Sequence, residues 1–255
     1  MRLLSRVLLS VIALFFAGRC SAQQPFFRAL AFYTDKGEPD HVDFAKQAIA
    51  FYMDLAKKDG FAFEATMHWE ELNSERLKDV QLVLWLNDFP LKPEQRVTFQ
   101  KYMKQGGAWM GFHVAAYNDS ETHWPWFLEF LGGGVFCGNN WPPLPAKLLV
   151  DDTGHPVTRR LGGSFEAPAN EWYAWRPTPR ENKNVKVLVS LAPENYPIGL
   201  KDTITAGDLP VVWTNTKYRM LYVNMGHGEK IFSSGEQNKL LEDAVLWLGK
   251  RTARP

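Results

Sequence analysis

Residues 80–86, Val-Gln-Leu-Val-Leu-Trp-Leu, form an almost unbroken apolar run that constrains the fold more than any other segment. A strand with apolar side chains on both faces is typical of the centre of a parallel sheet that helices cover on both sides. Strand-like and helix-like hydrophobic patterns alternate around this run. We predict strands at 28–34, 61–67, 80–86 and 108–113, and helices at 43–58 and from Pro93 to Gly106-Gly107. This order predicts an α/β fold, with a mainly parallel, doubly wound sheet in a three-layer sandwich.

The pattern is less regular after Trp124. A short helix is predicted at 124–131, and strands are predicted at 144–151, 171–175, 185–191, 211–215 and 219–226. The last two strands are close enough in sequence to form a hairpin. The buried face of a final helix runs from Leu240 to Leu248, and Ser233 or Ser234 is expected to cap it.

The first 22 residues resemble an export signal. Arg2 and Arg6 precede an apolar run from Val7 to Ala17, and small residues follow at Ser21-Ala22. The run is too short to span a bilayer, which needs about 20 residues. We therefore expect residues 1–22 to be cleaved, residues 23–255 to form one domain, and the mature chain to be periplasmic or extracellular.

Charge and cysteine content exclude several classes of function. The formal net charge of the whole chain is +1, and cleavage would make it slightly negative by removing three arginines. This balance favours neither nucleic acid nor a membrane surface as a partner. Only Cys137 would remain, so no internal disulfide is expected. The sequence leaves a homo-oligomer open.

Two predicted strands lead to a histidine beside glycine. The first ends at His113, and the segment 220–228 carries His227 between Gly226 and Gly228. Ligands of α/β folds bind at the carboxyl ends of parallel strands, so both imidazoles are candidate catalytic groups. Each also has a structural explanation: His113 could bond a backbone carbonyl, and the glycines could serve only a tight turn.

Five short motifs occur in order along the chain. They are Gly111-Phe112-His113 after Gly106-Gly107, Gly154-His155-Pro156-Val157, Glu171-Trp172-Tyr173, Pro210-Val211-Val212-Trp213, and Met225-Gly226-His227-Gly228. Together they resemble the trehalose-utilisation, or ThuA-like, domain family over about residues 28–249. The resemblance implies a flavodoxin-like fold of the class I glutamine amidotransferase-like superfamily. It also implies a role in the metabolism of disaccharides and their oxidised derivatives.

The resemblance adds Glu171 as a third catalytic candidate, a general acid or base or a clamp on sugar hydroxyls. Without the resemblance, the simplest explanation of Glu171 is an exposed carboxylate on an edge strand. Glutamine hydrolysis is not expected, because that chemistry needs a thiolate at the elbow that His113 occupies, and Cys137 lies downstream. Serine hydrolase chemistry is not expected either, since no Gly-x-Ser-x-Gly elbow occurs.

Five further residues are candidates for binding a sugar: Asp88, Asn118, Trp141, Tyr173 and Trp175. Indole and phenol rings stack on the CH-rich face of a pyranose, and the polar side chains could bond hydroxyls. The competing explanations are a packed core for the aromatic residues and turn or helix capping for Asp88.

No cofactor is predicted, and a divalent metal is left open. The chain has no His-x3-His pair on one helix. A metal site would require His41, His113, His123 or His227 to converge with Asp or Glu from separate loops. Sequence alone cannot show such convergence.

These observations lead to two hypotheses. The first is an exported enzyme that acts on a disaccharide or keto-sugar by acid–base chemistry of His113, Glu171 and His227. The alternative is a sugar-binding module without catalysis that uses its tryptophans to hold the ligand.

Overall fold

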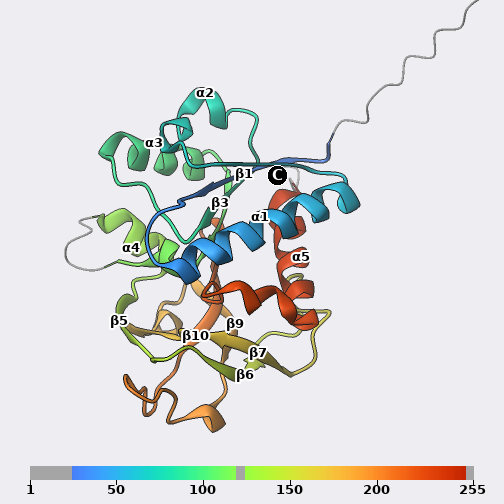
Figure 1. Ribbon diagram of the computed structural model, residues 1–255. Helices are drawn as coiled ribbons and strands as arrows, with labels where there is room; N and C mark the ends of the chain where they lie inside the picture. Colours follow the sequence, from blue (N-terminus) through green and yellow to red (C-terminus); the bar gives the residue numbers. More distant parts are fainter. Residues whose placement is uncertain (1–24, 119–123, 251–255) are drawn as a thin grey trace, which may run out of the picture.

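A mixed nine-stranded sheet forms the centre of the computed structural model, which describes residues 25–118 and 124–250 (Figure 1). The strand order is β2-β1-β3-β4-β11-β10-β9-β6-β7. The first five strands in this order are parallel, and their bounds are β1 Arg28–Tyr33, β2 Ala62–Thr66, β3 Leu82–Leu86, β4 Ala108–Phe112 and β11 Arg219–Val223. This parallel half confirms the predicted doubly wound α/β fold.

The other half of the sheet is antiparallel and extends the parallel half beyond β11. Its strands are β10 Pro210–Asn215, β9 Val185–Leu191, β6 Leu144–Val150 and β7 Ser164–Asn170. The expected hairpin of the last two strands is confirmed by the antiparallel pairing of β10 with β11. A separate two-stranded sheet pairs β5 (Val135–Asn139) with β8 (Tyr173–Arg176).

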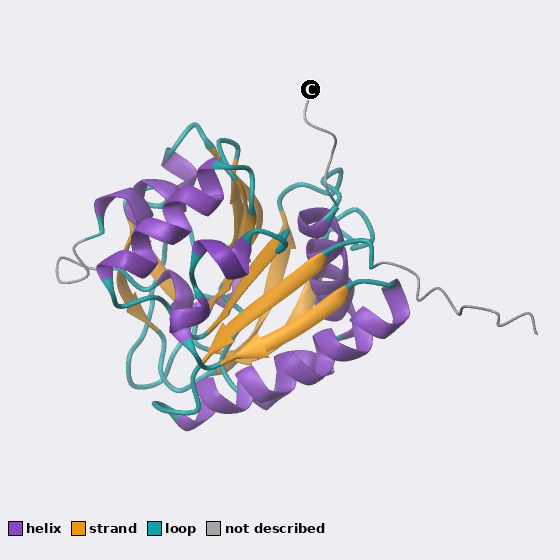
Figure 2. Ribbon diagram, turned by 90° about the horizontal axis from the view of Figure 1, so that it is seen from above, coloured by secondary structure: helices purple, strands orange, loops and turns teal. Residues whose placement is uncertain are grey.

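Helices cover both faces of the parallel half (Figure 2). Helices α1 (Pro39–Asp59) and α5 (Gly235–Gly249) lie on one face, and α2 (Ser74–Leu77), α3 (Pro93–Lys104) and α4 (Pro125–Leu131) lie on the other. Alternate residues of β3 point to the two helical layers. Leu84 packs in the hydrophobic core with α1 and α5, whereas Trp85 packs in the hydrophobic core with α3 and α4. All five residues of β3 are buried, as its apolar run predicted.

Helix α1 begins earlier than expected, and this difference matters for the site. A polar loop was expected through His41, but the helix starts at Pro39, with Glu38 as its N-cap residue. Proline suits the first helical position because it has no N–H to leave unpaired, and Asp40 in the first turn favours the helix dipole. Glu38 and His41 are therefore held at the start of a helix, directly after β1.

Several predicted strand ends are also wrong. Strand β4 stops at Phe112, and His113 begins a short 3-10 helix, η2 (His113–Ala116). Strand β11 stops at Val223, so His227 lies in the loop that follows. Glu171 connects β7 to β8 and does not lie in a strand at 171–175. Strands β5 and β7 were not predicted, because glycine, proline and polar residues interrupt their alternation.

The expected export signal, residues 1–22, lies outside the described residues, and the single domain over 23–255 stays a prediction. Within residues 25–118 and 124–250, no helix has the length and apolar character needed to cross a membrane.

Candidate functional site

Four side chains from distant segments converge at the carboxyl edge of the parallel strands. His41 comes from the start of α1, His113 follows β4, Glu171 links β7 to β8, and His227 follows β11. One ligand atom of each lies within 4.8 Å of the others. The ring centroids of the three imidazoles are 5.1 to 5.5 Å apart. We call these four residues the histidine–glutamate cluster, and it contains all three predicted catalytic residues.

The backbone around the cluster adopts an uncommon conformation. Asn87 directly follows β3 with φ 55°, and His113 directly follows β4 with φ 48°. Residues other than glycine rarely adopt this left-handed region, and the strain it stores tends to occur at functional sites. Gly226 permits the close packing here, because a Cβ at that position would lie 2.6 Å from the Cβ of His113.

Buried asparagines hold the loops of the cluster together. Asn170 Oδ1 accepts hydrogen bonds from the backbone N–H groups of Gly226 and His227, at 3.1 and 3.0 Å. Its Nδ2 donates to the backbone oxygen of Glu171, at 2.7 Å, and to Asn224 Oδ1, at 3.2 Å. Asn87 plays a similar part, since its Nδ2 donates to the backbone oxygen of Gly226 and its Oδ1 accepts from the backbone N–H of Val114.

Carboxylates face the imidazole nitrogens of the cluster. Glu171 Oε2 lies 3.4 Å from His113 Nε2 and 3.6 Å from His227 Nε2. Glu38 bridges the other two rings, with Oε2 3.0 Å from His41 Nε2 and Oε1 3.1 Å from His227 Nε2. The side chain of His113 is 0% exposed, whereas that of Glu38 is 38% exposed. The cluster therefore reaches solvent on the side of Glu38.

Burial keeps the imidazoles of His41 and His113 neutral. It lowers the pKa of His113 well below the ordinary value, and His227 nearby adds to this effect. Burial, together with the neighbouring His113, lowers the pKa of His41 to about 4. Burial also raises the pKa of Glu171, because it disfavours the charged carboxylate. At neutral pH, His41 and His113 thus offer lone pairs, which suits a base or a metal ligand.

The protein should lose stability as the pH falls from 6.5 to 5. The pKa values of His41 and His113 are lower in the folded chain than in the unfolded chain, where they are near 6.5. Their contribution to stability is complete above pH 6.5, and each can lose up to about 1.4 kcal/mol per pH unit below it. The raised pKa of Glu171 acts in the opposite direction, so we expect a net loss of about 2 kcal/mol.

Urea denaturation at pH 6.5 and 5.0, with a chelator present, measures this loss. The variant His41→Asn removes one titrating group and should show a clearly smaller pH dependence. Equal stability of the wild-type chain at the two pH values would contradict the assignment of neutral buried imidazoles.

Two predicted sugar-binding residues make hydrogen bonds within the scaffold. Asp88 accepts from Trp69 Nε1 through Oδ2, at 2.7 Å, and from the backbone N–H of Phe89 through Oδ1, at 2.9 Å. Asn118 is buried, and its Nδ2 donates to the backbone oxygens of Ala116 and Gly134. These bonds hold both side chains in the scaffold, and Asn118 is buried, so their sugar-binding role stays a prediction.

The aromatic candidates differ in position. Tyr173 is buried, and its ring lies on the imidazole of His113 with centroids 4.1 Å apart, so it forms one wall of the cluster. Trp175 is buried against Trp213 and Tyr222 in the core. Trp141 is half-buried and anchored by its backbone N–H to Asp202. Their roles in binding stay predictions, with Tyr173 best placed.

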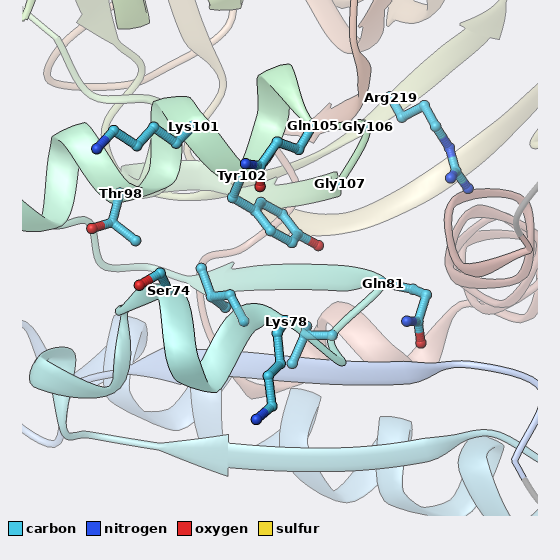
Figure 3. A pocket seen from close by; sticks show the side chains of 12 residues that line it. Ser74, Lys78, Gln81, Thr98, Lys101, Tyr102, Gln105, Gly106, Gly107 and Arg219 are labelled. Carbon is cyan, nitrogen blue, oxygen red and sulfur yellow. The ribbon is translucent and has the colours of Figure 1, made fainter. Parts of the chain in front are cut away.

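A separate cavity of about 370 Å³ lies at the opposite edge of the sheet (Figure 3). Its lining includes Gln81 before β3, Gly107 before β4 and Arg219 at the start of β11, which are the amino ends of parallel strands. Since α/β sheets bind ligands at the carboxyl ends of their strands, the histidine–glutamate cluster lies at the expected ligand edge and this cavity does not.

Comparison with known proteins gives the family. The model of the ThuA (trehalose utilisation) family matches residues 28–248. The chain belongs to the ThuA family. A solved structure of a protein from Bacteroides uniformis described as ThuA-like is 51% identical, with a TM-score of 0.87 over 89% of this chain and 93% of its own. No curated protein matches the chain significantly.

Solved structures with lower sequence identity share this fold. Another protein described as ThuA-like, from Parabacteroides merdae, is 15% identical, with a TM-score of 0.64 over 91% of this chain and 93% of its own. A glutamine amidotransferase from Thermotoga maritima is 8% identical, with a TM-score of 0.56 over 89% of this chain and 99% of its own. These likenesses show the fold alone, and they confirm the glutamine amidotransferase-like architecture.

Sequence reasoning missed two carboxylates of this ThuA-family site. Glu38 bridges two imidazoles, and Asp40 Oδ2 lies 3.6 Å from His227 Nδ1. His41 was considered only as a metal ligand, and the structure does bring it to the centre. The sequence did hold a clue to Glu38, Asp40 and His41. All three follow the strand predicted at 28–34, and so they lie at the same sheet edge as His113. His123, the fourth histidine considered, lies outside the described residues.

Proposed function

We propose that this ThuA-family protein is an enzyme that acts on a carbohydrate, a disaccharide or its keto derivative, at the histidine–glutamate cluster. The observation that carries the proposal is the convergence of His41, His113, His227 and Glu171 at the carboxyl edge of parallel strands. Imidazoles and carboxylates are groups that take up and release protons, and the raised pKa of Glu171 brings this carboxyl closer to neutral pH. The description of the family as trehalose utilisation supports a sugar as the substrate.

The reaction that fits these groups best is removal of a proton from the carbon next to a sugar carbonyl. The C–H electron pair forms the carbon–carbon double bond of the enediolate, the C=O π pair moves to the carbonyl oxygen, and the base holds the proton. Glu38 and His41, at the solvent side, are placed to act as the base. The negative charge on the oxygen must be stabilised inside the cluster, either by a hydrogen bond from a protonated Glu171 or by a cation.

The alternative function, a sugar-binding module, gains less support from the geometry. Such a module needs indole faces that a sugar can reach. Trp172 is fully buried, and Trp124 and Trp175 are nearly so. Burial in the core explains these side chains, whereas Trp126 and Trp141 are half-buried and keep part of their surface for a ligand.

Incubation with sugars in deuterium oxide tests the enzymatic proposal. The chain from Gln23, which corresponds to the expected exported form, is mixed with unoxidised and keto forms of disaccharides and followed by proton NMR. We expect exchange of the hydrogen next to the carbonyl, because the base returns a solvent deuteron. Glu38→Gln should slow this exchange by about 100-fold, within the usual range for general acid–base groups.

His68→Ala is the matched control, because His68 is an exposed histidine outside the cluster. Its exchange rate should equal that of the wild type. Recovery of every sugar unchanged and without deuterium from the wild-type protein would exclude the proposed reaction.

A further inference from the structure

We propose that His41, His113, His227 and Glu171 bind one divalent first-row transition-metal cation, with Zn²⁺ as the reference case. The cation would occupy the centre of the site proposed above, but its binding can be measured whether or not a sugar is turned over. Three features of the cluster support it: the tautomer of His113, the spacing of the ligand atoms and the balance of charge.

The orientation of His113 leaves a lone pair that a cation or a hydrogen-bond donor can meet. Its Nδ1 lies 3.0 Å from the backbone oxygen of Asn224, which can only accept, so Nδ1 carries the hydrogen. Asn224 Nδ2, 3.3 Å from the same nitrogen, has another acceptor in Tyr222 Oη. His113 Nε2 is therefore an unprotonated nitrogen in the interior, and it has no hydrogen-bond partner in the described structure.

This nitrogen faces a carboxylate. His113 Nε2 and Glu171 Oε2 are 3.4 Å apart, and both would be acceptors if Glu171 were ionised. Two acceptors at this distance repel each other unless a proton or a cation lies between them. The same oxygen is 3.6 Å from His227 Nε2, so a positive group placed there would serve three side chains at once.

The spacing of the atoms suits a cation better than a proton. A tetrahedral metal with bonds of about 2.0–2.1 Å separates its ligand atoms by roughly 3.3 Å. The two Glu171 distances, 3.4 and 3.6 Å, already match this edge. The remaining ligand atoms lie within 4.8 Å and need only a small contraction. A single proton can lie between only one pair of these atoms, whereas one cation can bind all four side chains.

The ligand types and the surrounding groups select the kind of cation. Imidazole nitrogens with one carboxylate oxygen favour zinc, iron or other first-row transition metals over Ca²⁺ or Mg²⁺. His113 is oriented by a backbone carbonyl, and His227 Nδ1 faces Asp40, which is how metal-bound histidines are usually held. The carboxylates of Glu38, Asp40 and Glu171 surround the imidazoles, and a divalent cation would offset carboxylate charge there.

With a bound cation, charge stabilisation and proton transfer would fall to different groups of the site. It would take the lone pairs of the imidazoles and stabilise the negative sugar oxygen directly. Glu38, released from the nitrogens of His41 and His227, would then carry the proton. This division agrees with the greater exposure of Glu38 than of Glu171.

Equilibrium dialysis of the chelator-treated chain against Zn²⁺, followed by metal analysis, tests the proposal without any sugar. We expect one bound cation per chain and a rise in Tm of about 5–10 °C at a Zn²⁺ concentration 100 times Kd. His41→Ala should weaken binding at least about 100-fold, more than the loss of a residue that only orients a ligand. His68→Ala, at an exposed histidine outside the cluster, should bind as the wild type does.

The variant Glu171→Gln separates a cation from a proton. The introduced amide could donate to His113 Nε2 as a protonated Glu171 would, but the substitution removes the anionic ligand. The proposal predicts that this variant folds and binds Zn²⁺ at least about tenfold more weakly. Wild-type affinity in both His41→Ala and Glu171→Gln, or no binding by the wild type below millimolar Zn²⁺, would overturn the metal site. Since turnover is not measured here, failure of this test leaves the sugar reaction to be decided by deuterium exchange.

Discussion

His113→Ala should reduce turnover of the keto-sugar by about 100- to 10,000-fold, the range expected for loss of a group in acid–base chemistry. The imidazole of His113 has no contact with solvent, so it acts through its neighbours. Its Nε2 faces Glu171 Oε2 at 3.4 Å, and its ring packs on Tyr173. Removal of the ring would take away one wall of the cluster and the orientation of Glu171. Steady-state kinetics on the substrate found by deuterium exchange measures the loss, which should lie in kcat.

Two comparisons separate this loss from a general loss of folding. His155→Ala changes a half-buried histidine that packs on Trp247, and it should leave kcat within about twofold of the wild type. His113→Asn keeps a polar side chain of smaller size and should still be inactive if folded by circular dichroism. A folded His113 variant with full activity would refute the role of the cluster in catalysis.

Asn170→Ala should lower the free energy of unfolding by about 3–5 kcal/mol, which makes it the largest single-residue effect on stability that we predict. The side chain is fully buried and makes five hydrogen bonds. Its loss would leave the backbone N–H groups of Gly226 and His227 buried without an acceptor, and each such group costs about 1–3 kcal/mol. Urea denaturation at pH 7 measures the change.

Asn73→Ala provides the matched comparison. Asn73 caps the short helix α2, where its side chain accepts from the N–H of Arg76, and its removal should cost only about 1 kcal/mol. Asn170→Asp keeps the acceptor for both N–H groups. Its loss in free energy of unfolding should lie between those of Asn73→Ala and Asn170→Ala. A loss below 1 kcal/mol in Asn170→Ala would show that the His227 loop is held by other contacts.

Much of the parallel half could be predicted from the sequence, because its signals are local. The apolar run at 80–86 predicted a strand buried on both faces, and Pro93 and the Gly106-Gly107 pair marked the ends of α3. The antiparallel half was harder. Strand β7 contains Pro168, and β5 contains Gly138, so neither shows the regular alternation that identifies a strand. Their pairing depends on partners that are distant in sequence.

The sequence predicted the main residues of the site but not how they are arranged. His113, Glu171 and His227 were all identified, and the structure brings them together. Glu38 was missed, because the helix it precedes was expected to begin after His41. Asn118 and Trp175, which were predicted to bind a sugar, are buried in the scaffold and the core, and their role in binding stays a prediction. A local pattern does not distinguish a buried aromatic side chain from one that lines a pocket.

The amino-acid sequence by itself determined the fold class and the sheet edge at which chemistry should lie. Both follow from the periodicity of neighbouring residues, and parallel strands place all their carboxyl ends on one side. Only the tertiary structure decided which side chains meet there. His41 and His227 are far apart along the chain, and their imidazoles reach 5.1 Å because strand order, the left-handed backbone at His113 and the buried asparagines fix four separate loops together. Such long-range packing leaves no trace in the spacing of residues along the chain.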